Sequence, residues 1–397
     1  KIVEPSTVGF HVSDAERHLL NALARPFSCD FRKTPLADVA AFIGKKTGVD
    51  VVLDRRALDD VGIPLDFPVT FRVSGITLRS ALRLMLRDLD LTSVVQEEVL
   101  LITTPEQGEE RLTTAVFAVP DLVTFPDASG KATCDFGPLV DLVTSTVRPD
   151  AWDDVGGPGS ITGCTLGKAR FVVVSQTQDV LEEVFDLVRV LREIARQRAA
   201  GKIPEPVMVG DPGMRTPAVE AIRKALEKKL SFEFVEMPLE NVAAEIGKKA
   251  GINILLDRRA LDDVGIGFDT PVTKTASDMT LRQFLRLVLR ELDLTYVIQD
   301  EVLWVTTPEM SESRLLVGVY PVPDLAAVRD APGNIRCDFD APVDLITSLV
   351  TPDTWDEVGG PGSIGIAPFM NVDALVICQM PDVHEEIGDL LAVLRKV

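Results

Sequence analysis

The residues whose types and spacing best suit chemistry lie in a segment that occurs twice. Trp152 begins the run WDDVGGPGSI, and Trp355 begins the run WDEVGGPGSI. Adjacent carboxylates could hold calcium or serve acid–base hydrolysis, and an indole ring suits contact with a sugar or the buried centre of a protein interface. The candidate binding residues are Trp152, Asp153, Asp154, Gly156, Gly157 and Gly159 in the first run, and Trp355, Asp356, Glu357, Gly359, Gly360 and Gly362 in the second.

These runs have one structural interpretation and several functional ones. In the structural one, the run connects a helix to a strand, its Trp is anchored in the core, and its glycines adopt backbone angles closed to other residues. In the functional ones, it is a partner-binding loop or, alternatively, a loop that binds a cell-wall glycan or small ligand. Calcium is disfavoured because the oxygen spacing of an EF-hand is absent, and a hydrolase because adjacent carboxylates need not converge on one substrate. Gly156 to Gly159 has the spacing of the KH-domain nucleotide clamp, but Asp153 and Asp154 beside it disfavour phosphate.

A second candidate is a block of eleven residues, LDRRALDDVGI, which is identical at residues 53–63 and 256–266. Its apolar side chains can pack inward, namely Leu53, Ala57, Leu58, Val61 and Ile63. Its charged side chains can then pair locally on the exposed side, where such pairs contribute only about 0.3–0.5 kcal/mol each. They form either a solvated surface or a docking surface shared by both copies. The candidate docking residues are Arg55, Arg56, Asp59, Asp60, Arg258, Arg259, Asp262 and Asp263.

Catalytic and metal-binding signals are few. The three histidines, His11, His18 and His384, form no H-E-x-x-H motif, so we expect structural or exposed roles for them. The five cysteines include no C-x-x-C pair and their number is odd, so at least one thiol is unpaired, and we expect most of them to be small buried apolar residues. We therefore predict no enzymatic activity, no catalytic residue, no metal site and no cofactor.

Composition disfavours several classes of partner. The 397 residues include 61 Asp and Glu against 41 Lys and Arg, which gives a formal net charge of −20. That charge repels phosphate backbones and anionic lipid, so nucleic acid is not an expected partner. Hydrophobic residues make up 46% of the chain, enough for packed domains. No apolar run approaches the ~18 residues of a membrane-spanning helix, so we expect no membrane span.

An internal repeat organises the chain. Leu256 follows Leu53 by 203 residues, and Trp355 follows Trp152 by the same offset, without insertion or deletion. The chain is therefore interpreted as a tandem duplication of a long unit, not as a solenoid of short repeats. The predicted domains are residues 14–106, 111–197, 218–309 and 314–397, with a linker at residues 198–217. Because the linker is rich in Gly and Pro, we expect it to be extended or irregular and to leave the copies some freedom to reorient.

Hydrophobic periodicity and turn residues predict the elements. In the first part of each copy we expect a helix at residues 14–25, a strand at 28–31, a helix from Pro35 to Lys46, strands at 49–53 and 69–73, a helix capped by Thr77, and strands at 93–95 and 99–103. The order β-α-β-β-α-β-β lets two helices cover one face of a small mixed sheet. In the second part we expect strands at residues 113–119, 161–165 and 171–175 and helices at 139–147 and 179–196. The predicted fold class is α+β, with four small two-layer domains.

Residues of the first part resemble a known domain family, the secretin and TonB short N-terminal (STN) domain. The resemblance is carried by Phe31, Pro35-Leu36, Gly48, Ile76-Thr77-Leu78-Arg79, Leu89 and Leu91-Thr92, and it recurs at Phe234, Pro238-Leu239, Gly251, Thr280-Leu281-Arg282 and from Leu292 to Thr295. The second part is similar to the KH-like, ring-forming N-domains that follow in secretins. The run WDDVGGPGSI resembles envelope proteins of planctomycete-type bacteria that carry such modules.

The resemblance implies a location in the periplasm or cell envelope and a role in docking and assembly. Secretins continue into a membrane β-barrel, but this sequence holds no such series of alternating strands, so pore formation is not expected. The expected function is a non-enzymatic protein-interaction or assembly module, related to secretion, whose partners are other envelope proteins or further copies of itself. The chain begins at Lys1 without a recognisable signal peptide, and we expect it to be processed or trimmed.

Overall fold

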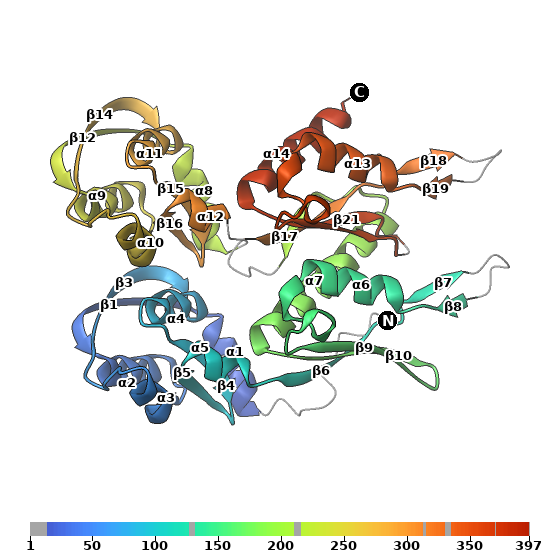
Figure 1. Cartoon of the computed structure of the whole chain (residues 1–397), viewed down its shortest axis with the longest axis horizontal. Helices are drawn as coiled ribbons and strands as arrows, with labels where there is room; N and C mark the ends of the chain where they lie inside the picture. The colour runs from blue at the N-terminus through green and yellow to red at the C-terminus, as the bar shows by residue number, and fades with distance from the viewer. Residues whose placement is uncertain are drawn as a thin grey trace. The chain divides into compact units, whose positions relative to one another are not determined.

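The chain mixes short helices with small sheets, which confirms the predicted α+β class; Figure 1 shows a computed structural model of it. The structure describes residues 14–126, 132–209, 216–312, 315–329, 335–369 and 371–396. We call the described parts of residues 14–109 and 110–209 modules A and B, and those of residues 216–312 and 315–396 modules A′ and B′. The boundaries of the four domains stay a prediction, and His11 lies outside the described residues.

Modules A and A′ have the same elements, offset by 203 residues. Module A contains α1 (Asp14–Leu23), β1 (Pro26–Pro35), α2 (Leu36–Thr47), β2 (Val51–Leu53), α3 (Arg55–Asp60), β3 (Pro68–Thr77), α4 (Leu78–Arg87), β4 (Thr92–Gln96), β5 (Val99–Thr103) and α5 (Pro105–Glu109). Module A′ contains α8 (Pro217–Leu226), β12 (Lys229–Pro238), α9 (Leu239–Ala250), β13 (Ile254–Leu256), α10 (Arg258–Asp263), β14 (Pro271–Thr280), α11 (Leu281–Arg290), β15 (Thr295–Gln299), β16 (Val302–Thr306) and α12 (Pro308–Glu312).

The strands of module A form two sheets, so the prediction of one mixed sheet is wrong. β1 and β3 form an antiparallel two-stranded ribbon, and β2, β5 and β4 form a separate sheet in which β2 runs parallel to β5. The ribbon has register shifts between Phe27 and Cys29 and between Phe31 and Thr34. Such bulges bend and twist a strand pair, which separates the ribbon from the flatter sheet. Module A′ repeats both sheets.

Several local signals act as predicted. The Thr77 side chain accepts a hydrogen bond from the Ser80 N–H at 3.2 Å and caps α4. Gly48 ends α2 with a φ of 75°, in the left-handed region that favours glycine. Two details differ. The repeated block folds into the short helix α3, and Val61 at its end is 46% exposed, so it does not pack inward. Pro35 lies before α2 as its N-cap residue, not in its first turn.

Modules B and B′ each pack helices on one antiparallel sheet. Module B contains β6 (Thr113–Ala118), β7 (Thr124–Pro126), β8 (Ala132–Cys134), α6 (Gly137–Thr146), η1 (Pro149–Ala151), η2 (Asp153–Val155), β9 (Ser160–Leu166), β10 (Ala169–Gln176) and α7 (Gln178–Ala199). Module B′ contains β17 (Leu316–Pro321), β18 (Ala327–Arg329), β19 (Ile335–Cys337), α13 (Asp340–Leu349), η4 (Pro352–Thr354), η5 (Asp356–Val358), β20 (Ser363–Ala367), β21 (Ala374–Gln379) and α14 (Pro381–Leu394). The strand orders are β6-β10-β9 and β17-β21-β20, and the small hairpins β7–β8 and β18–β19 were not predicted.

The linker is more ordered than its composition predicts. β11 (Val207–Val209) lies in the linker and pairs antiparallel with the edge strand β17. Val209 is buried in the core that module B shares with B′. The expectation of an extended segment holds for these residues, but they are fixed to a sheet, so the expected freedom to reorient is wrong for this part of the linker. Local composition does not predict this strand pairing, because the pairing partner is more than a hundred residues away in the sequence.

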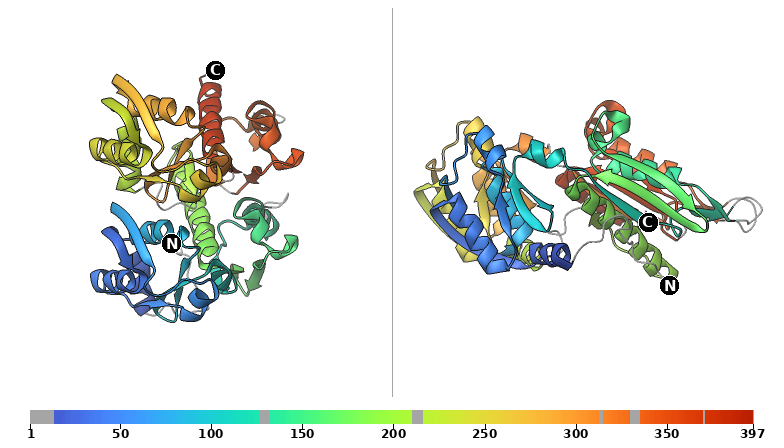
Figure 2. Two further views of the ribbon diagram at one scale, coloured as in Figure 1. Left: turned by 60° about the vertical axis from the view of Figure 1, so that its left-hand side comes forward. Right: turned by 90° about the horizontal axis from the view of Figure 1, so that it is seen from below.

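Like modules pack together. The chain divides into two compact units, one formed by modules A and A′ and the other by modules B and B′. In Figure 1 and Figure 2, A is blue beside A′ in yellow, and B is green beside B′ in red. Each unit therefore joins two stretches that are far apart in the sequence.

Candidate functional site

The runs at residues 152–161 and 355–364, which we call the WD loops, each anchor their tryptophan in the core. Trp152 lies between η1 and η2, is 1% exposed, and donates its indole Nε1–H to the Val147 carbonyl at 2.8 Å. Trp355 is equally buried and donates in the same way to the Val350 carbonyl at 2.9 Å. Both rings belong to apolar cores. Neither ring face is open to a sugar, so the alternative prediction that these indoles recognise a glycan is wrong.

The loop glycines have separate structural tasks. Gly156 has a φ of 91°, which strongly favours glycine. A Cβ on Gly157 would lie 2.3 Å from the Ala151 carbonyl carbon, and one on Gly159 would lie 2.1 Å from Nε2 of Gln176. That same Nε2 donates to the Ala151 carbonyl at 2.8 Å and ties the loop to β10. Because Gly159 is buried in this contact, the loop is not shaped as an open nucleotide clamp. The second loop repeats the arrangement with Gly359, Gly360, Gly362 and Gln379.

The tip of each loop is open to a partner. The exposed tip residues are Asp153, Asp154, Val155 and Gly156 in one loop and Asp356, Glu357, Val358 and Gly359 in the other, and Pro158, Ser160 and Pro361 are exposed beside them. Val155 is 67% exposed and Val358 is 66% exposed, each next to two carboxylates. An apolar side chain held out by a hydrogen-bonded turn suits a protein contact. The role of these tips as partner-binding loops stays a prediction.

His384 is a buried structural residue. Its Nε2 lies 2.8 Å from the Leu316 carbonyl oxygen, and its Nδ1 lies 2.7 Å from the Tyr320 hydroxyl. Because a carbonyl oxygen only accepts, Nε2 carries the hydrogen and Nδ1 accepts from the tyrosine. Burial lowers the pKa of His384 to about 4, so the ring is neutral at physiological pH. His18, in contrast, is exposed.

All five cysteines are free thiols, and only two of them are buried, so the prediction that most are buried is wrong. Burial raises the pKa of Cys29 to about 11 and that of Cys378 to about 12, which keeps both thiols protonated and unreactive. Cys134 is exposed, and Cys164 and Cys337 are half-buried.

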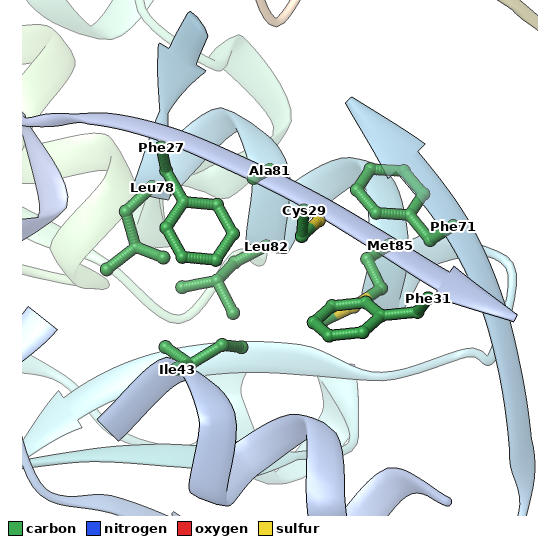
Figure 3. Close-up of a pocket in the computed structure, with 9 residues that line it drawn as sticks. All are labelled: Phe27, Cys29, Phe31, Ile43, Phe71, Leu78, Ala81, Leu82 and Met85. Carbon is green, nitrogen blue, oxygen red and sulfur yellow. The ribbon is translucent and has the colours of Figure 1, made fainter. Parts of the chain in front are cut away.

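A pocket in module A is lined by nine residues from β1, α2, β3 and α4 (Figure 3). Figure 3 shows Phe27, Phe31, Phe71 and Met85 around it, and Cys29 is its only titratable group. A pocket without a carboxylate, imidazole or amine offers no acid–base pair for catalysis. Within the described ranges, no group of three or more His, Cys, Asp and Glu side chains could hold a metal ion.

The repeated LDRRALDDVGI block has different surroundings in its two copies. In module A, Arg55, Arg56, Asp59 and Asp60 are all exposed. In module A′, the Arg259 side chain pairs with a residue outside the block, Asp90 of module A, at 2.5 Å. The Arg258 guanidinium lies 4.5 Å from the Phe268 ring centre. Asp257 of the second block likewise pairs outside it, with Arg87 of module A at 3.7 Å. Local pairing within each block stays a prediction. Docking by all eight charges stays a prediction.

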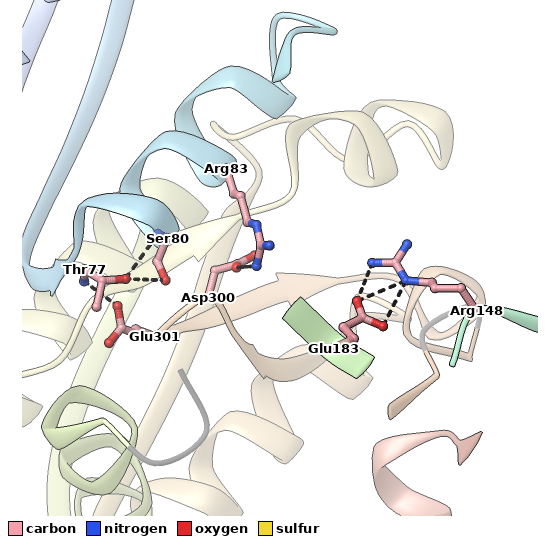
Figure 4. A network of polar contacts seen from close by, with 7 residues as sticks. All are labelled: Thr77, Ser80, Arg83, Arg148, Glu183, Asp300 and Glu301. Carbon is pink, nitrogen blue, oxygen red and sulfur yellow. Dashed lines mark hydrogen bonds and ion pairs between the residues drawn. The ribbon is translucent and has the colours of Figure 1, made fainter. Parts of the chain in front are cut away.

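The start of α4 in module A meets the β15–β16 turn of module A′ (Figure 4). The Thr77 backbone N–H donates to the Glu301 carboxylate, and Arg83 pairs with Asp300 at 3.8 Å. Glu301 is 2% exposed, although it lies at a hairpin turn. A carboxylate is buried at a turn only when a partner compensates for its lost hydration, which module A does here.

Two further polar contacts join the same modules. The Asn253 side chain accepts from the Ser74 N–H at 3.1 Å and donates to the Ser74 carbonyl at 2.8 Å. Arg87 pairs with Asp257 at 3.7 Å. Figure 4 also shows the Arg148–Glu183 pair, which lies within module B.

Apolar residues of A′ complete the core of A. Four side chains on the outer face of the A′ sheet pack there, namely Leu255, Val297, Val302 and Trp304. The next residues along the strand, Leu303 and Val305, point the other way into the core of A′ itself. The Arg87 guanidinium lies 5.1 Å from the Trp304 ring centre, in cation–π geometry. The A′ sheet is therefore buried on both faces.

Module B′ shares a core with B in the same manner. The outer face of its sheet packs into the core of B through Val317, Val319, Val376 and Cys378. Helix α6 lies against β20, where the Ser363 hydroxyl donates to the Ser145 carbonyl at 2.6 Å. A Cβ on Gly365 would lie 2.8 Å from Cδ1 of Leu142, so glycine lets the helix approach.

Sequence reasoning missed these inter-module residues. None of Trp304, Arg87, Asp300 and Glu301 was a candidate. One signal was present: β16 reads VLWVT, and an apolar run without alternation indicates a strand buried on both faces.

No protein-family model and no curated protein matches this chain. It is similar to the solved structure of XcpQN012, with 13% sequence identity and a TM-score of 0.16, over 53% of this chain and 85% of that one. It is also similar to the N-terminal domain of the secretin XcpQ from Pseudomonas aeruginosa, with 15% identity and a TM-score of 0.14, over 51% of this chain and 77% of that one. None of the helices in the described residues is long and apolar enough to cross a membrane.

Proposed function

We propose that this chain is a non-enzymatic protein-interaction or assembly module of the cell envelope, with two tandem copies of an STN-like domain followed by a KH-like domain. The observation that supports this most is the sharing of cores. Residues of A′ complete the core of A, and residues of B′ complete the core of B. Apolar sheet faces that pack against other modules are docking surfaces, because exposing their apolar side chains to water would raise the free energy of the folded chain.

The chain uses two modes of docking on itself. In the first, a helix of one module lies on the sheet face of another, as α6 does on β20. In the second, the linker strand β11 extends the sheet of module B′ at the edge of β17. Strand addition of this kind is a common way for a domain to bind an extended partner segment. The envelope location rests on the resemblance of the Ile76-Thr77-Leu78-Arg79 pattern to STN domains.

The loop tips are the proposed contacts to other proteins. A photo-crosslinking residue at Val155 or Val358 of the full chain should give a discrete adduct in envelope extract, because both side chains are exposed on a hydrogen-bonded turn. The matched control is Val393, which is 57% exposed on α14 and should give none. No adduct from either tip, together with a chain that stays monomeric in size-exclusion chromatography, would contradict the proposal.

A further inference from the structure

Given the proposed function, we infer that one partner is a second copy of this chain, docked by repeating the contact between modules A and A′. That contact joins two different surfaces. The helix face, on module A, is the exterior of α4 with Thr77, Arg83, Leu84, Arg87 and Asp90. The sheet face, on module A′, consists of Leu255, Asp257, Arg259, Val297, Asp300, Glu301, Val302 and Trp304. Because every residue has a counterpart 203 positions away, A′ also carries a helix face, and A also carries a sheet face.

In the described part of the chain, nothing covers the helix face of A′. Leu84 on α4 is 1% exposed, whereas its counterpart on α11, Leu287, is 44% exposed. Arg286 and Arg290, the counterparts of Arg83 and Arg87, are exposed, and neither forms an ion pair with a described residue. An exposed leucine between two such arginines is suited to bind a surface that combines apolar and acidic side chains.

The sheet face of module A is likewise not covered by any of the residues that the structure describes. Val302 and Trp304 are buried, but their counterparts Val99 and Leu101 are only half-buried. Val52, in the same row of side chains as Leu101, is 43% exposed. The β5 strand VLLIT is apolar without alternation, like β16, so its composition fits burial on both faces although only one is fully buried.

Charge complementarity is preserved between the two free faces. Arg83–Asp300 would become Arg286–Glu97, Arg87–Asp257 would become Arg290–Asp54, and Arg259–Asp90 would become Arg56–Asp293. All three pairs keep their signs and their direction. Two contacts would be lost: Leu101 replaces Trp304, which removes the cation–π contact, and Asp50 replaces Asn253. The contact between chains is therefore expected to be weaker than the internal one.

The geometry of the contact has a consequence for assembly. Different surfaces meet, so the contact is heterologous, and a heterologous contact that repeats yields a ring if the rotation closes or a filament if it does not.

The B–B′ unit has the same asymmetry on its helix side. Thr146 on α6 is fully buried, whereas its counterpart Leu349 on α13 is 62% exposed.

Sedimentation velocity of the full chain over a range of concentrations tests the inference. The wild type should form oligomers that grow with concentration and weaken with added salt, because the contact contains ion pairs. Leu287→Glu on the helix face and Val52→Glu on the sheet face should each weaken association by at least about tenfold, as expected for a central apolar residue. Val235→Glu is the control, since Val235 is 69% exposed and belongs to neither face. Circular dichroism should show the same fold for all variants.

Mixing the two disabled chains is the decisive step. Each has one intact face, so Leu287→Glu and Val52→Glu chains should form a 1:1 complex together and nothing larger, although each alone is monomeric. A mixture that stays monomeric, or a wild type that is monomeric at every concentration, would overturn the inference. In that case adducts at Val155 or Val358 with a different protein would leave the proposed function standing, and their absence would remove it as well.

Discussion

At the scale of single residues, the cores of modules B and B′ are packed by different side chains at equivalent positions. Module B′ buries the polar pair Tyr320 and His384, where module B has Phe117 and Leu181. A Cβ on Gly318 would lie 2.9 Å from Cε1 of His384, so the larger polar pair requires a glycine next to it. These are coupled substitutions in one core, and the histidine has a structural task.

The buried histidine makes stability depend on pH. Its pKa is 6.5 when unfolded and about 4 when folded, so the unfolded state binds the proton first as the pH falls. The stabilisation from the neutral ring is complete above pH 6.5 and is lost as the pH falls toward 4, a change of about 3 kcal/mol in the free energy of unfolding. Replacing the pair with that of module B, by Tyr320→Phe with His384→Leu, should remove this part of the pH dependence. Urea denaturation at neutral and acidic pH measures the free energy of unfolding of both proteins. An equal change of this free energy with pH in wild type and variant would contradict the assignment.

At the scale of elements, strand β11 shows how tertiary context gives structure to a linker. Residues 199–217 are rich in Gly and Pro, yet Val207 to Val209 pair with β17 and bury one side chain in a shared core. The segment is therefore part of the B–B′ unit, although its composition is typical of a connection.

Substituting the buried residue of this strand tests its role. Val209→Asp would bury a charge without a partner and should cost roughly 3 kcal/mol, and it should make the linker easier to cleave by protease. Ile203→Asp, at a linker residue that is 60% exposed, should change stability by no more than about 0.5 kcal/mol. Limited proteolysis and urea denaturation compare the two. Equal cleavage of both variants would show that β11 is not paired in solution.

At the scale of the whole molecule, each unit depends on contacts between copies of the repeat. Trp304 of A′ lies in the core of A, whereas its counterpart Leu101 lies half-buried on the uncovered sheet face. The same position in the fold therefore has different energetic importance in the two copies.

Truncating both positions measures that difference. Trp304→Ala should cost about 3–5 kcal/mol, because it leaves a cavity in the shared core and removes the contact with Arg87. Leu101→Ala should cost roughly 1 kcal/mol in the monomer, because that side chain is only half-buried. Chemical denaturation at a concentration where the chain is monomeric provides the comparison. Similar costs would mean that A and A′ do not share a core in solution.

Much of the local structure was predictable from the sequence. The Thr77 cap and the Gly48 stop depend on interactions within a few residues, so sequence patterns describe them well. The structural interpretation of the first WD loop predicts the anchoring of Trp152, and its ring is buried. The separation of the β1–β3 ribbon was not predictable, because strand pairing depends on contacts between segments about forty residues apart.

The sequence by itself determined the repeat, the α+β class and the positions of most elements, because those follow from periodicity, caps and turn residues. Only the tertiary structure decided which of two equivalent surfaces is covered. Glu98 and Glu301 are the same residue at the same turn, and Arg56 and Arg259 lie in an identical block, yet among the described residues only the second of each pair bonds to another module. Local sequence cannot distinguish them, because burial is set by which module lies against the surface.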